Sequence, residues 1–451
     1  MTKMWNWIKN KWRRFRKWIV GIFIGSAIAG TAVLGLLPNE SVEPIEQEVI
    51  SERTETTKHF LIETLVDGRK RYRGVTSIAP FHYKDNYADE SEQWKDIDPT
   101  IELVNGKLQV TKAPYTLEVF QDRAGFRVVS KKDGSWVELT LDGNPSVVKA
   151  TRVGNKVTLI DAFPNVDVEI VANERGVTLF KSIKGTLAKN EMRYTIQEKK
   201  GAVHVVNSVL ARDGNNNKVT AAQENVNSVR VADHQEYTRV ETFTPQAFRD
   251  DVEQVLSYPI RMDAQVSVGA SSDDAVFVAN FYDYNDTDTS LLIGRPFGVV
   301  ASLGMRFLSL SIPSGATVDT ATVTGVSTGF SGAPATIWYA EDSGLSPATF
   351  SSGSRPDQRT KTAASQTWTI PNVDTGVTQT SPSLVSLLQE VVDDWSGLTH
   401  LVIIVEDNTG SGSVFRDWAS WDHATLAAPL VDYTYTAGGG GGDQANTQII
   451  D

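Results

Sequence analysis

Short runs in which apolar and polar residues alternate fill most of the chain between Lys58 and Ser257. In VDVEI at 166–170, for example, every second residue is valine or isoleucine and the residues between them are acidic. Successive side chains of a β-strand point to opposite faces, so this pattern predicts strands with one buried and one solvated face. Gly, Asp and Asn between the runs indicate turns. Residues 58–257 are therefore predicted to form a β-rich domain, with further strands at 107–110, 115–120, 126–130, 136–141, 157–160 and 177–183.

The pattern changes near Tyr258, after which charged residues become scarcer and Ser, Thr, Ala and Gly more frequent. Many short strands separated by turns are typical of a β-sandwich. Residues 258–436 are therefore predicted to form a second β-domain in tandem with the first. Its strands are expected at 275–279, 305–310, 322–328, 336–340, 367–370, 401–406 and 430–435.

One segment of this second region has a helical period instead. Its apolar residues recur at steps of three and four: Leu384, Leu387, Leu388, Val391, Val392 and Trp395. Ser381 is an N-cap candidate, Pro382 suits the first helical position and Gly397 supplies a stop. We expect one short helix with its apolar stripe against the sandwich.

The first 37 residues have a third pattern. Residues 1–18 contain seven Lys or Arg, several large aromatics and no acid, and the run at 19–37 is apolar and uncharged. This order is typical of membrane targeting, and about 20 apolar residues suffice to span a bilayer. A membrane-targeting helix is therefore expected, with cytoplasmic residues 1–18 and a span at 19–37. Its interface residues are expected to be Trp5, Trp12, Arg13, Arg14, Phe15, Arg16, Lys17 and Trp18.

A cleaved signal peptide would explain the same segment, because Ala27-Ile28-Ala29 fits a small-residue cleavage site. The chain is thus expected either to stay anchored or to be secreted after cleavage near Ala29. Residues 38–57 are acidic and contain Pro, which predicts a solvated stalk. Residues 437–451 begin with a glycine tract and are predicted to be a flexible tail.

Charge and cysteine content narrow the functional classes. The formal net charge is −12, and the first eighteen residues contribute +7, so the remainder carries −19. A body this acidic repels phosphates, which argues against nucleic acid as a partner. Without Cys the chain has no disulfide, no thiol nucleophile and no Cys-ligated zinc, so large cores must supply its stability.

Ordered stretches of the second region resemble the DNRLRE-type module of bacterial surface proteins and phage virion-associated proteins. The stretches are YPIRMDAQVSVGASSDD (258–274), LGMRFLSLSIPSGATVDTATV (303–323), SPSLVSLLQEVVDDWSG (381–397), LVIIVEDN (401–408) and APLVDYTYT (428–436). The resemblance implies a jelly-roll-like sandwich over 258–436, with the helix at one end.

The first region resembles the β-rich segment that precedes such modules in Rhs-type and wall-associated surface proteins. The matching stretches are IAPFHYKD (78–85), QWKDIDPTI (93–101), APYTLEVF (113–120) and FPNVDVEI (163–170). The two resemblances together imply scaffolding or presentation on a cell or virion surface, without catalysis.

A catalytic alternative rests on acids and a histidine around Trp94: His82, Lys84, Asp85, Asp96 and Asp98. Two carboxylates and an imidazole are the groups that acid/base cleavage of a glycosidic bond uses. Asp96 and Asp98 flank Ile97 in a strand-like run, however, and alternation places such acids on the solvated face. We therefore expect these residues to be structural and the protein not to be an enzyme.

Two binding hypotheses remain. Calcium prefers clustered oxygen ligands, which the acidic stretches supply at Asp273, Asp274, Asp283, Asn285, Asp286 and Asp288. Solvated acidic turns explain the same stretches without a metal. Carbohydrate sites use exposed aromatic rings, and the candidates are Trp338, Tyr339, Trp418 and Trp421, although aromatics of a sandwich also fill its core.

These observations together predict a membrane-anchored display, adhesion or structural protein of a cell or phage surface. Its expected partners are the membrane, a glycan or cell-wall polymer, and other surface or virion proteins. A carbohydrate-binding module is the alternative, and calcium is the one cofactor considered.

Overall fold

The computed structural model describes residues 46–438 except 121, 142–148, 164, 188–189, 206–210, 216, 250–251, 269–271, 280–282, 287, 330–331 and 424–425. The predicted targeting segment, residues 38–45 of the predicted stalk and most of the glycine-rich tail lie outside these residues. Among the described residues, no helix combines the length and apolar character that crossing a membrane requires.

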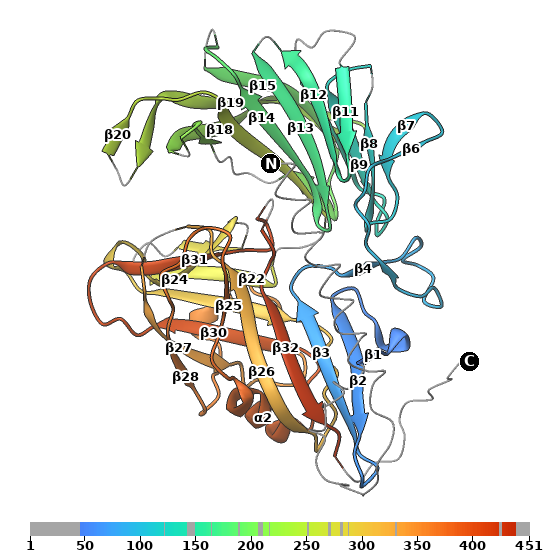
Figure 1. Ribbon diagram of the computed structural model, residues 1–451, viewed down its shortest axis with the longest axis vertical. Coiled ribbons are helices and arrows are strands. Elements are labelled where there is room, and N and C mark those ends of the chain that lie inside the picture. Colours follow the sequence, from blue (N-terminus) through green and yellow to red (C-terminus); the bar gives the residue numbers. More distant parts are fainter. Residues whose placement is uncertain are drawn as a thin grey trace, which may run out of the picture. The chain divides into compact units, whose positions relative to one another are not determined.

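Antiparallel β-sheet dominates the described chain, as the alternating pattern predicts (Figure 1). The largest sheet has 16 strands. Fourteen of them follow the order β11-β12-β13-β14-β21-β17-β18-β19-β15-β10-β9-β8-β7-β6, while β16 pairs with β21 and β20 with β19. The strands are β6 (Glu102–Val104), β7 (Lys107–Val110), β8 (Tyr115–Val119), β9 (Gly125–Ser130), β10 (Trp136–Leu141), β11 (Lys149–Val153), β12 (Lys156–Phe163), β13 (Val166–Asn173), β14 (Gly176–Ile183), β15 (Glu191–Lys199), β16 (Val203–Val205), β17 (Ala211–Arg212), β18 (Lys218–Val231), β19 (His234–Arg249), β20 (Val252–Gln254) and β21 (Ile260–Val268).

The alternation along these strands builds their core. In β13 every second residue from Val166 is buried, and its acids lie on the other face. Inward-facing residues of many strands form one apolar cluster, which includes Leu117, Phe126, Ile170 and Leu179. Burying this much apolar surface on one face drives the sheet to curl over itself.

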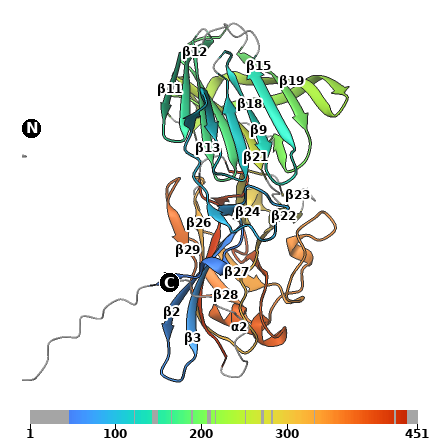
Figure 2. The same cartoon turned by 90° about the vertical axis from the view of Figure 1, so that its right-hand side faces the viewer.

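Two six-stranded sheets form the second body of structure. One has the order β1-β2-β3-β32-β26-β29 and the other β23-β22-β25-β30-β27-β28. The first comprises β1 (Gln47–Glu48), β2 (Thr57–Thr64), β3 (Lys70–Ser77), β26 (Thr317–Val326), β29 (Thr378–Thr380) and β32 (Leu430–Thr436). The second comprises β22 (Asp274–Val278), β23 (Asp283–Asn285), β25 (Ala301–Phe307), β27 (Ala335–Ala340), β28 (Gln366–Thr369) and β30 (Leu401–Asp407). Residues of both sheets share one core, so together they are sandwich-like (Figure 2).

Smaller elements complete the described chain. β4 (His82–Tyr83) pairs with β5 (Lys95–Asp96), and β24 (Ser290–Arg295) pairs with β31 (Val414–Ala419). Short 3₁₀ turns lie at Ile50–Glu52, Pro296–Gly298 and Pro356–Gln358.

One α-helix, α2 (Val385–Asp394), lies within the described residues and buries Leu387, Leu388, Val391 and Val392 as predicted. It starts later than expected, because the Ser381 hydroxyl accepts the backbone N–H of Val323 instead of capping the helix. Gly397 does end it, with a φ of 126° and its N–H bonded to Val392 O. Trp395 departs from the predicted apolar stripe, since it is 39% exposed and donates its indole N–H to Asp342.

Strand pairing crosses the boundary predicted at 257/258. β2 and β3, from the predicted first domain, share a sheet with β32, from the predicted second domain. β21 begins at Ile260 but pairs with β14 in the large sheet. The end of the predicted stalk is also folded, because β1 pairs with β2 and Arg53 bonds Glu48 at 2.7 Å. The division into tandem domains therefore stays a prediction, whereas the all-β class is confirmed.

Candidate functional site

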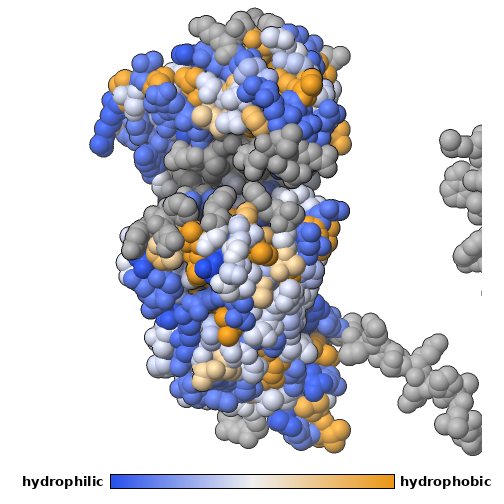
Figure 3. Space-filling model, turned by 90° about the vertical axis from the view of Figure 1, so that its left-hand side faces the viewer, coloured by the Kyte–Doolittle hydropathy of each residue, from blue (hydrophilic) through white to orange (hydrophobic). Residues whose placement is uncertain are grey.

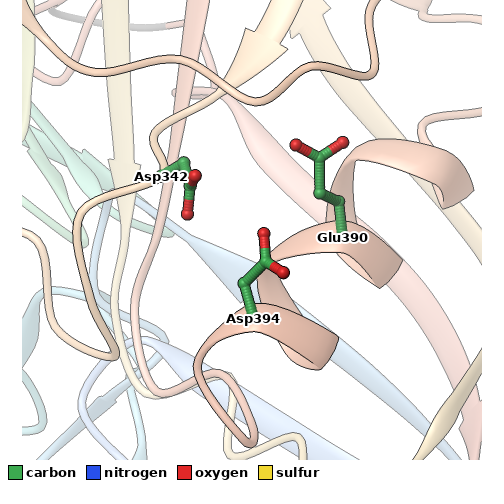
Figure 4. Close-up of side chains that lie close together, drawn as sticks. All are labelled: Asp342, Glu390 and Asp394. Atoms are coloured by element: carbon green, nitrogen blue, oxygen red, sulfur yellow. The ribbon is translucent and has the colours of Figure 1, made fainter.

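Three carboxylates meet at the C-terminal end of α2 (Figure 4). Glu390 and Asp394 are one helical turn apart, and Asp342 reaches them from the segment after β27. One oxygen of each lies within 4.8 Å of the others. The Glu390 oxygens accept the N–H groups of Ala363 and Ala364 at 2.6 and 2.7 Å, which fixes the orientation of that carboxylate. Clustered carboxylate oxygens are the ligands that hard cations such as Ca²⁺ prefer.

The sequence contained part of this acidic triad. Glu390 and Asp394 stand four residues apart in the predicted helix, a spacing that places two side chains on one face, but they were not among the predicted metal residues. Asp342 could not be added, because only the packing of α2 beside β27 brings it there.

The predicted calcium residues do not gather in the same way. Asp273 pairs with Arg306 at 2.6 Å. The next side chain, Asp274, is buried and accepts the N–H of Trp421; burial, then Asp422, raises its pKa well above the usual range. Asp286 accepts the hydroxyl of Tyr284, and Asp288 is exposed. Asn285 is half-buried, and the side chain of Asp283 lies outside the described residues.

No predicted calcium residue therefore joins a group of three acids or histidines among the described residues. Asp273 and Asp274 instead have partners within the protein. For Asp273 an ion pair, and for Asp274 a buried hydrogen bond, explains the acidic residue without a metal ion.

Three of the four aromatic candidates for sugar binding lie in the core. Trp338 and Trp418 are fully buried and Trp421 is 3% exposed. Trp338, Trp368 and Trp418 pack against one another with ring centroids 5.6–6.1 Å apart. A stacking platform needs an exposed ring face. These three rings therefore serve the core, and Tyr339, which is half-buried beside Lys361, is the remaining candidate.

The residues of the catalytic alternative are held by backbone contacts and by ion pairs. His82 is buried, its Nδ1 lies 2.5 Å from Thr54 O, and desolvation lowers its pKa. Asp96 is directly opposite His82 in the β4–β5 ladder, and its exposed carboxylate lies 3.6 Å from His82 Nε2, 3.3 Å from Arg53 and 3.4 Å from Lys58.

The other members of that group point elsewhere. Asp85 pairs with Lys95 and Lys131, and Asp98 lies 3.6 Å from Lys112. Lys84 sits 5.1 Å from the centre of the Trp94 ring. Arg and Lys partners thus hold the carboxylates of Asp85, Asp96 and Asp98, and of these three Asp96 is the one that also approaches His82.

The large sheet also has a polar recess that was not predicted from the sequence. Its volume is about 320 Å³, and it is lined by Glu198, Lys200, Gly201, Val205, Asn225, Ser228, Gln235 and Tyr237. Glu198 is only 6% exposed, and burial raises its pKa. Tyr237 hydrogen-bonds Glu198, and burial, followed by the Glu198 charge, raises the pKa of Tyr237 to about 12.

Neighbouring side chains hold the recess in place. Arg239 donates to Asn225 Oδ1 at 2.9 Å, and Gln235 donates to the Ser228 hydroxyl at 2.5 Å. Lys200 Nζ is 3.9 Å from Glu198 Oε1 and balances its charge. The recess thus offers hydrogen-bond donors and acceptors with little net charge. In the sequence, Glu198 and Tyr237 stand at inward-facing strand positions, where a polar residue is a signal of function.

Hydrophobic residues form small separate groups on the coloured part of the face in Figure 3. The large apolar side chains that are most exposed, including Val66, Val153 and Val255, belong to different segments of the chain. Scattered apolar residues are normal for a folded surface and do not define a docking face.

Comparisons with known proteins do not identify a family for this chain. No protein-family model matches the chain, and no curated protein matches it. Among solved structures, a Paenibacillus xanthan lyase aligns with 86% of this chain and 39% of its own, at 10% identity and a TM-score of 0.14. The chain thus spans well under half of that protein, and a TM-score of 0.14 does not show a shared fold. The resemblance to the DNRLRE-type and Rhs-type segments stays a prediction.

Proposed function

We propose that this protein is a non-catalytic display or structural protein, held on the outer side of a membrane by its N-terminal segment. The observation that carries the proposal is the order of that segment: seven cations in residues 1–18, then an uncharged apolar run at 19–37. Cations flanking an apolar segment stay on the cytoplasmic side, which sends the following chain across the membrane.

The β-sheet body supports the same role. It has no Cys, so it can fold without oxidation, and its acids are extensively paired with Lys and Arg at the surface. The Asp85 and Asp96 carboxylates of the catalytic alternative are likewise paired with Lys131 and Arg53. A stable β-sheet scaffold of this kind suits display of a surface better than catalysis of a reaction.

A topology experiment tests the proposal. The full chain, produced in a bacterial host, should sediment with membranes, and protease added to intact cells should digest the body. Ile24→Arg combined with Ile28→Arg places two charges in the apolar run, which costs about 5–7 kcal/mol of insertion free energy, and should leave the body inside the cell. Val66→Arg is the matched control, because Val66 is fully exposed. A wild-type body that resists protease in intact cells and is recovered in the cytosol would contradict the proposal.

The recess favours saccharide binding as a second function. Sugar hydroxyls both donate and accept hydrogen bonds, and the recess combines a carboxylate, amides and hydroxyls with one aromatic ring. Its volume falls in the range of small-molecule sites. Because Lys200 lies beside Glu198, an uncharged ligand fits better than an ionic one.

Ligand-observed NMR with neutral mono- and disaccharides tests this second function. Saturation transfer from the wild-type protein is expected to disappear in Tyr237→Phe, which removes the hydroxyl and keeps the ring. Tyr339→Phe is the control, since it alters the remaining aromatic candidate in the other sheet. Equal signals from wild type and Tyr237→Phe, or no signal with any sugar, would refute the recess as the binding site.

A further inference from the structure

Three polar side chains meet in the interior of the large sheet, far in sequence from one another. Lys181 on β14 contacts the carboxylate of Glu241 on β19 through Nζ and Oε2. The hydroxyl of Tyr194 on β15 contacts the other oxygen, Oε1. All three side chains are 0% exposed.

The groups around Lys181, Tyr194 and Glu241 are of two kinds: apolar side chains, and an arginine that fixes the Tyr194 hydroxyl. Leu179 and Ile183, which share the inward face of β14 with Lys181, are fully buried. Lys181 Nζ lies 5.0 Å from the centre of the Tyr194 ring. Arg239 hydrogen-bonds the Tyr194 hydroxyl, and burial raises the pKa of Tyr194 well above its usual range, so the phenol remains a donor.

An ion pair in this position is costly. Each charge loses its hydration on burial, and mutual attraction repays that loss only in part. An amine and a carboxyl group in contact, with water excluded, have another stable arrangement: a neutral amide, which removes both charges from the core.

We propose that Lys181 and Glu241 condense to an amide that crosslinks β14 to β19. The two residues are 60 positions apart, so the bond would close a long loop in a chain that has no Cys for a disulfide. The inference is independent of the proposed surface role.

The reaction balances without any other reactant. A proton passes from Lys181 Nζ to Glu241 Oε2, and the neutral nitrogen attacks the carboxyl carbon. Negative charge develops on Oε1, where the Tyr194 hydroxyl stabilises it. A second nitrogen proton moves to Oε2, which leaves as water. One N–C bond forms, one C–O bond breaks, and nothing is oxidised or reduced.

Peptide mapping of the full chain is the decisive test. If the amide forms, trypsin cannot cut after residue 181, and peptide 176–184 should be joined to peptide 240–249 with the loss of one water. The intact mass should be lower by the same water. Free peptides 176–181 and 240–249 in full yield, with no linked species, would overturn the proposal and leave a buried ion pair.

The chain contains its own matched control. Lys156 and Glu169 are 2.8 Å apart across β12 and β13, but their side chains are 40% and 21% exposed. Water competes at this pair, so no link is expected there. Equal linkage of Lys156 and Glu169 would indicate a preparation artefact and would also overturn the proposal.

Two variants assign the roles. Lys181→Arg keeps the positive charge but removes the amine, and the linked peptide should vanish. Tyr194→Phe should slow formation of the link in freshly made protein about a hundredfold, since it removes a donor to the developing oxyanion. An unchanged rate in Tyr194→Phe would refute the role of Tyr194.

Discussion

Gly325 shows how closely one residue can be fitted to the core. It lies on β26, and a methyl group added to its Cα would come within 2.1 Å of Cε3 of Trp418. Trp418 cannot move away, because it is fully buried and its indole N–H donates to Gln379 at 2.9 Å. Overfilling a packed core typically costs 1–3 kcal/mol.

Gly325→Ala should therefore lower the free energy of unfolding by about 2 kcal/mol. Urea unfolding, followed by tryptophan fluorescence, measures this change. Gly353→Ala is the control, since an added methyl group there meets nothing within 4 Å, and its stability should stay within about 0.5 kcal/mol of wild type. Equal free energies of unfolding for the two variants would contradict this prediction, because they would show that the Trp418 ring can move to make room for the added methyl group.

Burial also decides which residues remain available for function. Trp338 and Trp418 were selected from the sequence for their aromatic rings, and the fold uses both as core. The sequence gives the type of each side chain. It does not show which face of a strand packs against the second sheet. Glu198 shows the converse, because its charge suggests exposure and the sheet buries it.

At the scale of elements, local pattern predicted the strands and the helix well. Runs such as 115–120, 166–171 and 401–406 match β8, β13 and β30, since period-two burial is a local property of a strand. The start of α2 was missed because a contact distant in sequence, Val323 N–H to the Ser381 hydroxyl, removes the expected cap.

Strand partners could not be predicted in the same way. β3 pairs with β32 across more than 350 residues, and Arg73 on β3 bonds Asp432 on β32 at 2.6 Å. No local pattern contains such a pairing, which is selected by the complementarity of whole sheet faces. The acidic triad follows the same rule, because helical spacing relates Glu390 to Asp394 and only the tertiary packing adds Asp342.

At the scale of the whole described body, one arginine links the large sheet to the sandwich. Arg175 lies at the turn between β13 and β14 and is 1% exposed. It donates to the carbonyl oxygens of Ser420, Trp421 and Leu426 at 3.1, 2.8 and 2.7 Å, all in the segment after β31. Burial, then the charge of Arg175, lowers the pKa of the adjacent His423 to about 4, so this histidine is neutral at pH 7.

These contacts predict that the two bodies of structure unfold together. Arg175→Met keeps a long apolar side chain but leaves three buried carbonyls without their charged donor, at a cost of about 3 kcal/mol or more. Calorimetry should then resolve two transitions in place of one, because the large sheet and the sandwich each retain a complete apolar core. Arg69→Ala, which removes an exposed ion pair with Asp67, should leave a single transition at the wild-type temperature. A single unshifted transition in Arg175→Met would contradict the role of Arg175 in coupling the two bodies.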